Sequence, residues 1–547
     1  MRKILVGIIA ASALLAGQVP MPPRVGVGVI KRELTLAQAI EMALRNNLDI
    51  QIEKTAVSSA VEARRGARGW LDPRLRWSPG VEDRTTPTSS PLMGTDGKLV
   101  EKVFSQNFYF DQRLPWGGAA LSLNFENNRQ STTNPFVTLT PFVVSRLGAT
   151  LVVPLVRNRE IDRERANLRI AATQVDLASD QVELKVIDVI ARVEEAYWSL
   201  VAVRQSVEVA SEAVNLAREQ LARTRRMIES GTLAPVEIAA AEAELERRVD
   251  TWYAAIGQVT QAENALKLLI TSSLDEPLWN DEIVPVDTRT LQAPDADDLR
   301  AAVNRALAAR VELRALARQR EATEIQKMLA QNQTRPEVNL LAGYVSSGLA
   351  GEVSLHDNPF ARVSQVQVAR LNELSRLAGL EPLPPVSFGG VPPNQSGGYG
   401  SVLDGVFRGR YPTAFAGLQV NFTARNRAAE AQQAQAAIAS RRLELERSRM
   451  ELLIEAQVRN AFQAIQSARQ RIAAAEASAR AAEEKLASEI RLFQTGESTN
   501  FLVLTRQNEL ADSRQRVVAA RLEFNKAVAR AQQALGATLE HYNIRID

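Results

Sequence analysis

The chain of 547 residues contains no cysteine, which excludes disulfide bonds, iron–sulfur clusters and thiolate chemistry. Histidine is nearly absent: there are only His356 and His541, and neither has a partner at metal-ligand spacing. After the first residues there is no stretch of about 18 uncharged apolar residues, so no membrane-spanning helix is predicted. The 66 basic and 63 acidic residues nearly balance, which argues against nucleic-acid binding. We therefore expect no metal site, no cofactor and no nucleic-acid partner.

Glycine and proline are missing from two long stretches, residues 160–230 and 425–495, each 71 residues long and offset by 265. Each stretch ends at a glycine, Gly231 in the first and Gly496 in the second. As a single helix, each would be roughly 105 Å long at about 1.5 Å per residue. A compact domain needs nothing of that length, so we expect the length itself to serve the function.

Apolar residues in the first stretch recur at strict seven-residue steps. They are Val186, Val193, Leu200, Val207, Val214, Leu221 and Ile228. Adding 265 to the last six positions gives Val458, Ile465, Ile472, Ala479, Leu486 and Phe493. Such a pattern faces a partner helix continuously only if the helices supercoil left-handed. The narrow apolar stripe therefore predicts partner helices rather than a globular core.

After each glycine a second helical run follows, so each half contains a long antiparallel helical hairpin. Shorter front helices repeat as well, at an offset of 263. We predict a first repeat over 33–285, with front helices 35–70, β-segments within 74–156 and a hairpin over 160–270. We predict a second repeat over 297–540, with front helices 298–332, β-segments 337–348 and 413–424, and a hairpin over 425–536.

The β-segments alternate apolar with small or polar residues over about ten positions, as membrane β-strands do. In the first half four such segments lie near 74–84, 104–114, 119–129 and 142–155. A soluble sheet packed on another element would show the same alternation. Residues 346–412, between the second pair, are rich in Gly, Pro and Ser and suit an external loop, with room for a short helix near 363–380.

The N-terminal segment reads as a secretory signal peptide over residues 1–24. Arg2 and Lys3 precede an apolar run from Ile4 to Leu15, which is too short for an ordinary membrane span. A signal anchor is the alternative interpretation. A leader, no helical span, membrane-type strands and very long helices thus occur together in one chain.

In this combination the sequence resembles the TolC family of outer-membrane efflux ducts, over nearly everything after the leader. The resemblance is carried by Leu34-Thr35-Leu36-Ala37-Gln38-Ala39-Ile40 with Ala43, Leu44 and Asn47, by Val153-Pro154-Leu155-Val156-Arg157-Asn158, by Val420-Asn421-Phe422, and by both hairpin tips. It implies a mixed α/β membrane protein with two internal repeats. Three protomers would share one outer-membrane β-barrel, and their antiparallel hairpins would form a long α-helical barrel of twelve long helices in the periplasm.

The resemblance also implies partners: a homotrimer, outer-membrane lipid, a periplasmic adaptor protein, and an inner-membrane pump of the RND, ABC or MFS type. The duct would conduct passively and open by untwisting at the tips. By this resemblance, the adaptor would contact the two hairpin tips. Their residues are Gly231, Thr232 and Leu233 in the first, and Gly496, Glu497, Ser498 and Thr499 in the second.

The pore mouth and its gate would involve Glu237, Phe493, Asn500, Leu502 and Thr505. Glu237 stands where the family has the acid of a gating network, although a solvated acid at a helix start would look the same. Phe493 and Ser498 replace a tyrosine and an arginine of that network, and Leu502 and Thr505 replace two acidic rings. The first half also has two β-segments more than the family's simplest members, and we expect the usual two barrel strands from each half.

Three other classes compete with this interpretation. A periplasmic adaptor has a helical hairpin too, but would show one hairpin rather than two full copies. A coiled-coil filament protein would leave the β-segments without a role. An enzyme is least expected, because no nucleophile–base set, phosphate loop or metal constellation occurs, and the acids follow the charge pattern of helix surfaces.

Overall fold

The computed structural model describes residues 22–28, 30–90, 93–94, 96–287, 291–293, 298–354, 359–384 and 390–545. Most of the predicted signal peptide, and His356, lie outside these residues. The chain divides into two compact units. The helical unit comprises Met1–Val61, Thr173–Arg320 and Arg441–Asp547, and the sheet unit comprises Glu62–Ala172 and Glu321–Ser440. Each unit therefore contains parts of both predicted repeats, because the chain runs through each unit more than once.

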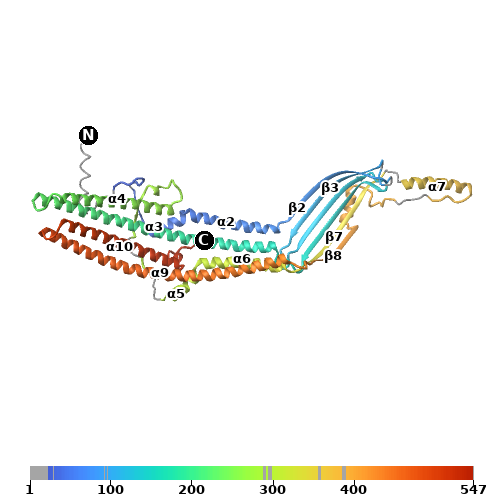
Figure 1. Cartoon of the computed structure of the whole chain (residues 1–547). Coiled ribbons are helices and arrows are strands. Elements are labelled where there is room, and N and C mark those ends of the chain that lie inside the picture. The colour runs from blue at the N-terminus through green and yellow to red at the C-terminus, as the bar shows by residue number, and fades with distance from the viewer. Residues whose placement is uncertain are drawn as a thin grey trace, which may run out of the picture. The chain divides into compact units, whose positions relative to one another are not determined.

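Long helices dominate the chain (Figure 1). Outside residues 346–412 the α-helices, long and short, are α1 (Leu36–Asn46), α2 (Leu48–Arg68), α3 (Arg163–Glu229), α4 (Glu237–Ile270), α5 (Leu299–Ala309), α6 (Val311–Gln333), α9 (Arg427–Thr495), α10 (Asn500–Ala534) and α11 (Thr538–His541). Helices α3 and α9 have 67 and 69 residues. The front helix α1 begins with a capping box, in which Thr35 and Gln38 satisfy each other's backbone N–H groups. No described helix is at once long enough and apolar enough to cross a membrane.

The seven-residue seam is buried, as the sequence predicts. Val193, Leu200 and Val214 of α3 are completely buried, in a cluster that includes Val259 and Leu266 of α4. In the second half the same seam contributes Val458 and Ile465 of α9 to two further clusters, the latter packed with Phe524 and Val528 of α10. Each hairpin thus closes on its own heptad stripe.

The two hairpins also lie against each other, since α3 and α10 are joined by polar contacts along their length. The Gln515 amide donates to the Ser206 hydroxyl at 2.7 Å, and Arg514 pairs with Glu212. Higher residue numbers on α3 meet lower numbers on α10, which is the register of an antiparallel pair. A four-helix layer therefore forms within one chain.

A second apolar stripe on α9 remains uncovered. Ile438, Leu445 and Leu452 follow one another at seven-residue steps and are 69%, 57% and 70% exposed. Residues at this spacing lie on one face of a supercoiled helix. This stripe has the pattern of a helix–helix seam without a partner helix in the chain.

The sheet unit contains one antiparallel sheet of six strands in the order β2-β3-β4-β5-β7-β8 (Figure 1). Its strands are β2 (Arg74–Pro87), β3 (Lys98–Arg113), β4 (Ala120–Thr132), β5 (Leu139–Pro154), β7 (Glu337–Val353) and β8 (Tyr411–Asn421). The expectation of two strands from each half is wrong for this sheet, because the first half supplies four. Gly117 and Gly118, both with positive φ, form the tight turn that keeps β4 paired with β3.

The two faces of this sheet differ in chemistry. Cross-strand partners share a face, and one face is mostly apolar, although Asp83, Lys102, Gln106, Asn127 and Arg129 interrupt it toward the loop ends of the strands. Along successive strands it carries Leu75, Trp77, Val81, Phe104, Phe108, Phe110, Leu121, Leu123, Phe125, Leu147, Ala149, Leu151, Leu340, Ala342, Tyr344, Leu418 and Val420. The other face carries Arg74, Arg76, Glu82, Asp111, Arg113, Asn124, Glu126, Asn128, Arg146, Thr150, Asn339 and Gln419. We call these the apolar face and the polar face.

Smaller elements lie outside these helices and the six-stranded sheet, among them two 3₁₀ helices, Gly69–Leu71 and Pro277–Trp279. A two-stranded parallel sheet joins β1 (Lys31–Leu34) to β6 (Glu282–Pro285) in the helical unit. The segment 346–412 contains two helices, α7 (Pro359–Leu377) and α8 (Tyr399–Phe407). The sequence favoured a short helix near α7. It gave no sign of α8, which is only nine residues long and lies between glycine-rich turns.

The C-terminal segment is anchored by a buried acid. Glu194 of α3 is 1% exposed and accepts a hydrogen bond from the Tyr542 hydroxyl. Burial raises the pKa of Glu194 from 4.5 to about 7, against the opposing effect of that hydrogen bond. Near neutral pH this carboxyl therefore titrates.

The buried seam leads to a first prediction. Replacing Leu200 by Asp places an unpaired charge at a fully buried position and should cost about 3–5 kcal/mol of stability. Gln181→Asp, at an exposed position of α3, has the same helix-propensity cost and should change stability little. Thermal unfolding of both purified variants measures the difference. Equal melting temperatures would contradict burial of the seam.

The anchoring acid leads to a second prediction. The folded chain binds the Glu194 proton more tightly than the unfolded chain, so its stabilising effect is complete below about pH 4.5 and lost as pH rises through about 7. Glu194→Gln stays neutral and should exceed the wild type in stability at pH 8 by up to about 3 kcal/mol, with little difference at pH 5. Melting temperatures at both pH values test this, with exposed Glu208→Gln as control. Parallel pH profiles for wild type and Glu194→Gln would refute it.

Candidate functional site at the hairpin tips

The turns that connect the long helices are built on two glycines with left-handed backbone. Gly231 has φ +74° and Gly496 has φ +84°, and both have open space where a side chain would be. After each glycine the next N–H turns back to the helix: Thr232 N donates to Met227 O, and Glu497 N to Leu492 O, both at 2.9 Å. This is the hydrogen bond of a Schellman motif. The glycines are needed for the backbone conformation rather than for close packing.

The returning helices begin differently at the two tips. At the second tip, Thr499 caps α10, and its hydroxyl oxygen accepts from Leu502 N at 3.4 Å. At the first tip, α4 begins at Glu237 and its N-cap residue, Val236, has no capping side chain. The Glu237 carboxylate instead lies in the first turn, where the helix dipole favours a negative charge.

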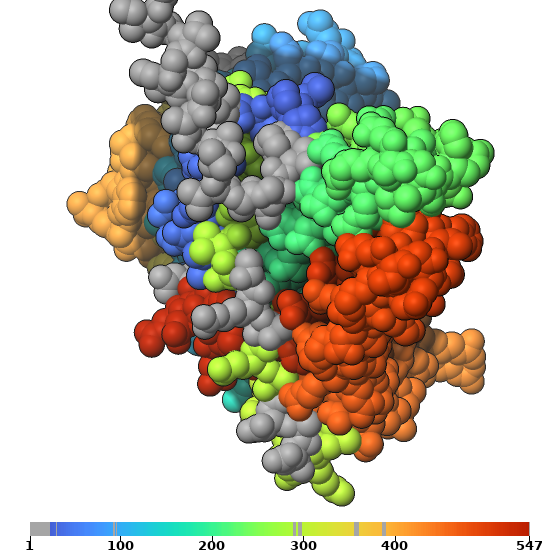
Figure 2. Space-filling model, turned by 90° about the vertical axis from the view of Figure 1, so that its left-hand side faces the viewer, coloured from blue at the N-terminus to red at the C-terminus, as the bar shows by residue number. Residues whose placement is uncertain are grey.

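A polar network joins the two tips. Asn500, only 2% exposed, donates from Nδ2 to Glu237 Oε2 at 3.1 Å and accepts at Oδ1 from Gln220 Nε2 at 2.8 Å. Gln220 and Glu237 belong to the first hairpin and Asn500 to the second. The structure therefore brings together two predicted gating residues, and adds a third that the sequence analysis missed. Figure 2 looks onto this end, where the green first hairpin borders the orange-red second hairpin.

A hydrophobic cluster lies under this network. Phe493, 1% exposed, packs with Leu486 of α9 and with Val503 and Leu510 of α10. Leu233 of the first tip packs against the same cluster. Phe493 is thus a core residue of the second hairpin, and Leu233 helps to hold the two tips together.

The remaining predicted residues lie at the surface. Glu497 and Thr499 are exposed, Leu502 is 37% exposed, and the Thr505 hydroxyl donates to the Phe501 carbonyl of its own helix at 2.8 Å. The Ser498 hydroxyl donates to Glu489 of α9. No acidic side chain stands at Leu502 or Thr505, so these positions form a neutral surface.

One basic side chain stands close to this surface. Arg506 donates to Glu509 at 2.8 Å and lies 3.6 Å from Glu489. These carboxylates, chiefly Glu509, raise the pKa of Arg506 further above its usual range. The arginine therefore stays charged, with both of its ion pairs inside the second hairpin.

Two residues at the tips were not identified from sequence. Gln220 is 2% exposed. Its place directly before the seam residue Leu221 was the only signal in the sequence. Phe501 is 73% exposed at the start of α10.

Comparisons with known proteins show which family model and which solved structures this chain resembles. Residues 120–272 match the family model described as outer membrane efflux protein. No curated protein sequence matches the chain. Among solved structures, the outer-membrane channel OprN is 14% identical, with a TM-score of 0.60 over 92% of this chain and 90% of its own.

Two further solved structures share the fold. The CmeC outer membrane channel of Campylobacter jejuni is 13% identical, with a TM-score of 0.60 over 94% of this chain and 90% of its own. The outer membrane protein VceC of Vibrio cholerae is 15% identical, with a TM-score of 0.60 over 92% and 96%. At these identities the likeness to the three structures concerns the fold.

The polar network leads to a third prediction. Asn500→Ala leaves the Gln220 amide and the Glu237 carboxylate without their shared partner, which should cost about 1–3 kcal/mol locally. We expect faster amide hydrogen exchange in residues 226–240 and 490–505 and unchanged exchange around Leu200. Thr505→Ala, which removes a hydroxyl bonded within its own helix, serves as the control. Equal exchange in both variants would show that the network does not hold the tips.

Proposed function

The chain belongs to the outer membrane efflux protein family, and from this premise we propose that it is the outer-membrane channel of a tripartite efflux or type I secretion system. It conducts substrates passively from a periplasmic adaptor and an inner-membrane pump to the exterior. The family consists of channel proteins rather than enzymes.

The observation that carries the proposal is the pair of unlike faces on the six-stranded sheet. An apolar face of this extent is costly in water, and Leu75, Val81 and Leu418 are 83%, 81% and 64% exposed. In an outer membrane the apolar face meets lipid, and the polar face lines a water-filled lumen. A periplasmic adaptor would not need a sheet with one exposed apolar face.

The two edge strands support the proposal that copies of the chain together complete a barrel. Every residue of β8 is exposed, and so is nearly every residue of β2. In lipid each unpaired backbone N–H or C=O costs several kcal/mol, so open edges are not tolerated. Strand β8 of one copy would pair antiparallel with β2 of the next. With three copies, as the family resemblance implies, six strands from each would make a barrel of eighteen.

The uncovered stripe on α9 supports the same assembly. In a ring of copies, Ile438, Leu445 and Leu452 would pack against a helix of the neighbouring protomer. Each copy brings four long helices, α3, α4, α9 and α10, so that three copies form the twelve-helix barrel in the periplasm. Burial of this stripe between protomers removes large apolar side chains from water.

The hairpin tips would form the periplasmic end and the adaptor contact. The exposed positions there, Thr232, Glu497, Thr499 and Phe501, suit a docking surface. The network of Gln220, Glu237 and Asn500 would act as the latch between hairpins, with Leu502 and Thr505 at the mouth. The inner-membrane partner would be a pump of the RND, ABC or MFS type.

A fourth prediction tests location and assembly together. Because the chain lacks cysteine, introduced pairs are its only thiols. Gln419→Cys on β8 is combined in turn with Arg74→Cys, Arg76→Cys or Ser78→Cys on β2. We expect the protein in the outer-membrane fraction, with reducible dimer and trimer bands from the pair in register. Gln419→Cys with Asn128→Cys on the interior strand β4 should give neither.

Each result has a definite meaning. Bands up to the trimer in the outer membrane support the shared barrel, and bands beyond the trimer would contradict three copies. A monomer in the soluble periplasm or in the inner membrane would refute the channel and bring the adaptor interpretation forward.

A further inference from the structure

Helix α8 covers part of the apolar face, near the end where the strands meet the long loops. The Ser346 hydroxyl of β7 donates to the Val406 carbonyl of α8 at 2.6 Å. Gly348, two residues further along β7, lies so close to the Val402 carbonyl oxygen that a Cβ would not fit between them. Ser346 and Gly348 belong to the apolar face by their register. In the proposed channel, α8 therefore lies on the outward side of the barrel.

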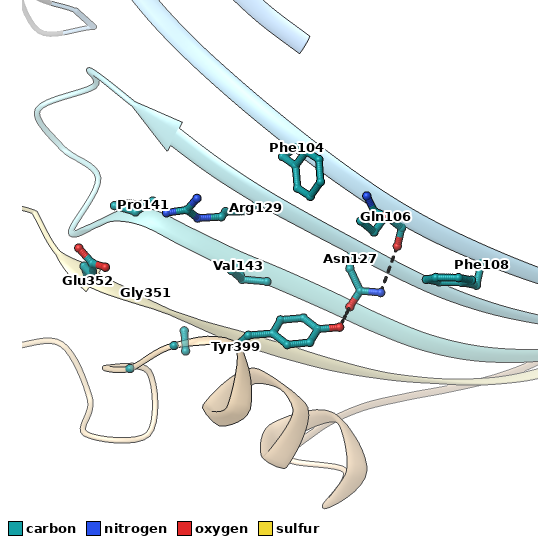
Figure 3. Close-up of a pocket in the computed structure, with 13 residues that line it drawn as sticks. Phe104, Gln106, Phe108, Asn127, Arg129, Pro141, Val143, Gly351, Glu352 and Tyr399 are labelled. Carbon is teal, nitrogen blue, oxygen red and sulfur yellow. Dashed lines mark hydrogen bonds between the residues drawn. The ribbon is translucent and has the colours of Figure 1, made fainter. Parts of the chain in front are cut away.

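A buried amide is held in place beneath this helix. Asn127 of β4 and Ser145 of β5 are buried cross-strand partners, and the Ser145 hydroxyl donates to Asn127 Oδ1 at 2.7 Å. The Tyr399 hydroxyl of α8 donates to the same oxygen at 2.9 Å (Figure 3). Asn127 Nδ2 in turn donates to the backbone carbonyl of Gln106 on β3 at 3.2 Å. These hydrogen bonds fix α8 on the sheet, and a cavity lies beside it.

The cavity has a volume of about 550 Å³, within the range of small-molecule sites. Along β3 its lining alternates between aromatic and polar side chains, since Phe108, Gln106 and Phe104 follow one another at two-residue steps on one face. Arg129 of β4 is the cross-strand partner of Phe104 and lines the cavity too. Glu352 lies at the end near the loops (Figure 3). Aromatic rings and hydrogen-bonding groups are therefore interleaved throughout the cavity.

Several of these polar groups have hydrogen-bonding capacity to spare. Gln106 accepts at Oε1 from Trp77 Nε1 at 2.7 Å, and its amide nitrogen has no partner in the described part of the chain. Among the same residues, Arg129 and Glu352 form neither a hydrogen bond nor an ion pair. The Trp77 ring also stacks on Phe108, with 6.4 Å between the ring centroids, which extends the aromatic surface beside the cavity. A ligand here would meet free donors, a free carboxylate and aromatic rings at once.

This mixture of groups matches the chemistry of a sugar ring. An alkyl chain would take water away from Arg129, Glu352 and the Gln106 amide without replacing their hydrogen bonds, which is costly. A sugar ring has C–H groups on its faces, and their positive hydrogens are attracted to the negative faces of aromatic rings. Its hydroxyls both donate and accept, so they can bind the guanidinium, the amide and the carboxylate together.

The level of the cavity on the sheet indicates which saccharide it meets. On the apolar face of β7, the large apolar side chains end at Tyr344, Ser346 follows, and Ala350 lines the cavity. The cavity thus lies just beyond the loop-side end of the band that would face hydrocarbon. We propose that it binds sugar rings of the glycolipid that forms the outer leaflet of the outer membrane. The inference rests on the proposed function, since it requires the apolar face to lie in that membrane.

Saturation-transfer difference NMR tests for the sugar contact. The detergent-solubilised, assembled protein, freed of co-purified glycolipid, is titrated with the lipid-free core oligosaccharide released from lipopolysaccharide. Phe104→Ala should weaken binding about three- to ten-fold, the effect of one aromatic contact. Phe104 is 48% exposed, so its truncation leaves no cavity in a core. Phe110→Ala, on the same strand and face but outside the cavity, should leave binding unchanged.

Two variants of the exposed Glu352 distinguish a hydroxyl from a cation as its partner. Glu352→Ala should weaken binding of the oligosaccharide about ten-fold. Glu352→Gln keeps an acceptor for a hydroxyl and should weaken binding only about three-fold. Equal losses in the two variants would show that the cavity selects a positive charge, and this would overturn the saccharide assignment.

Competition identifies the source of the saccharide. Intact lipopolysaccharide in mixed micelles should displace the oligosaccharide at a lower concentration than the free oligosaccharide itself, because its acyl chains hold it on the adjoining apolar face. No displacement would mean that the cavity takes a saccharide from solution, which contradicts the glycolipid. Displacement by a neutral tetrapeptide would assign the cavity to peptides, and absence of oligosaccharide binding would refute the site.

These outcomes are distinguishable from failure of the channel itself. An outer-membrane trimer that binds no saccharide would refute this site alone. A chain that does not reach the outer membrane would already have failed the fractionation and cross-linking test.

Discussion

In hydrocarbon every backbone N–H and C=O group needs a hydrogen-bond partner within the protein, and the proposed assembly depends on this requirement. A sheet of six strands with a lipid-facing side cannot end in two open edges, yet β2 and β8 are both exposed along their length. In the channel that we propose, copies of the chain would meet edge to edge and close the barrel. The uncovered apolar stripe on α9 would be covered by a helix of the neighbouring copy. Strand pairing and helix packing would then both stabilise the same assembly.

The extra β-hairpin in the first half would change the number of strands in the closed barrel. Strands β2 to β5 pair continuously with β7 and β8, so every copy adds six strands rather than four. Since the diameter of a barrel grows with strand number, this chain would form a wider exit than two strands from each half would allow. The polar face, which would line that exit, bears both signs of charge, for example Arg146 opposite Glu126. Such a lining favours a hydrated passage without a single-sign field.

The sequence predicted what depends on local periodicity and missed what depends on long-range contact. Seven-residue steps identified the buried seam, including Leu200 and Ile465, because the residues of a coiled-coil face recur at a fixed interval along one helix. Period-two alternation identified the strands but not how many join one sheet, which depends on pairing between distant segments. The position of α8 and the contact of Gln220 with Asn500, 280 residues apart, left no periodic trace. The family resemblance assigned Phe493 to the gate, but nothing in the sequence showed that it packs in the core of the second hairpin, with Leu233 of the first tip against the same cluster.

The composition of the tip contacts bears on how such a duct would open. The network of Gln220, Glu237 and Asn500 contains one charged group and two amides, so its strength depends less on ionic strength than that of a salt bridge. Charged contacts join the hairpins further from the tips, where Arg247 donates to Asn508 and Arg514 pairs with Glu212. The charged pairs near the tips, such as Arg506 with Glu509 and Arg225 with Glu242, lie within single hairpins and need not break when the hairpins separate. In the proposed channel, separation of the tips would expose Leu233 and the cluster around Phe493 to water. Apolar burial would then oppose opening, and an adaptor that covered the same residues would remove that cost.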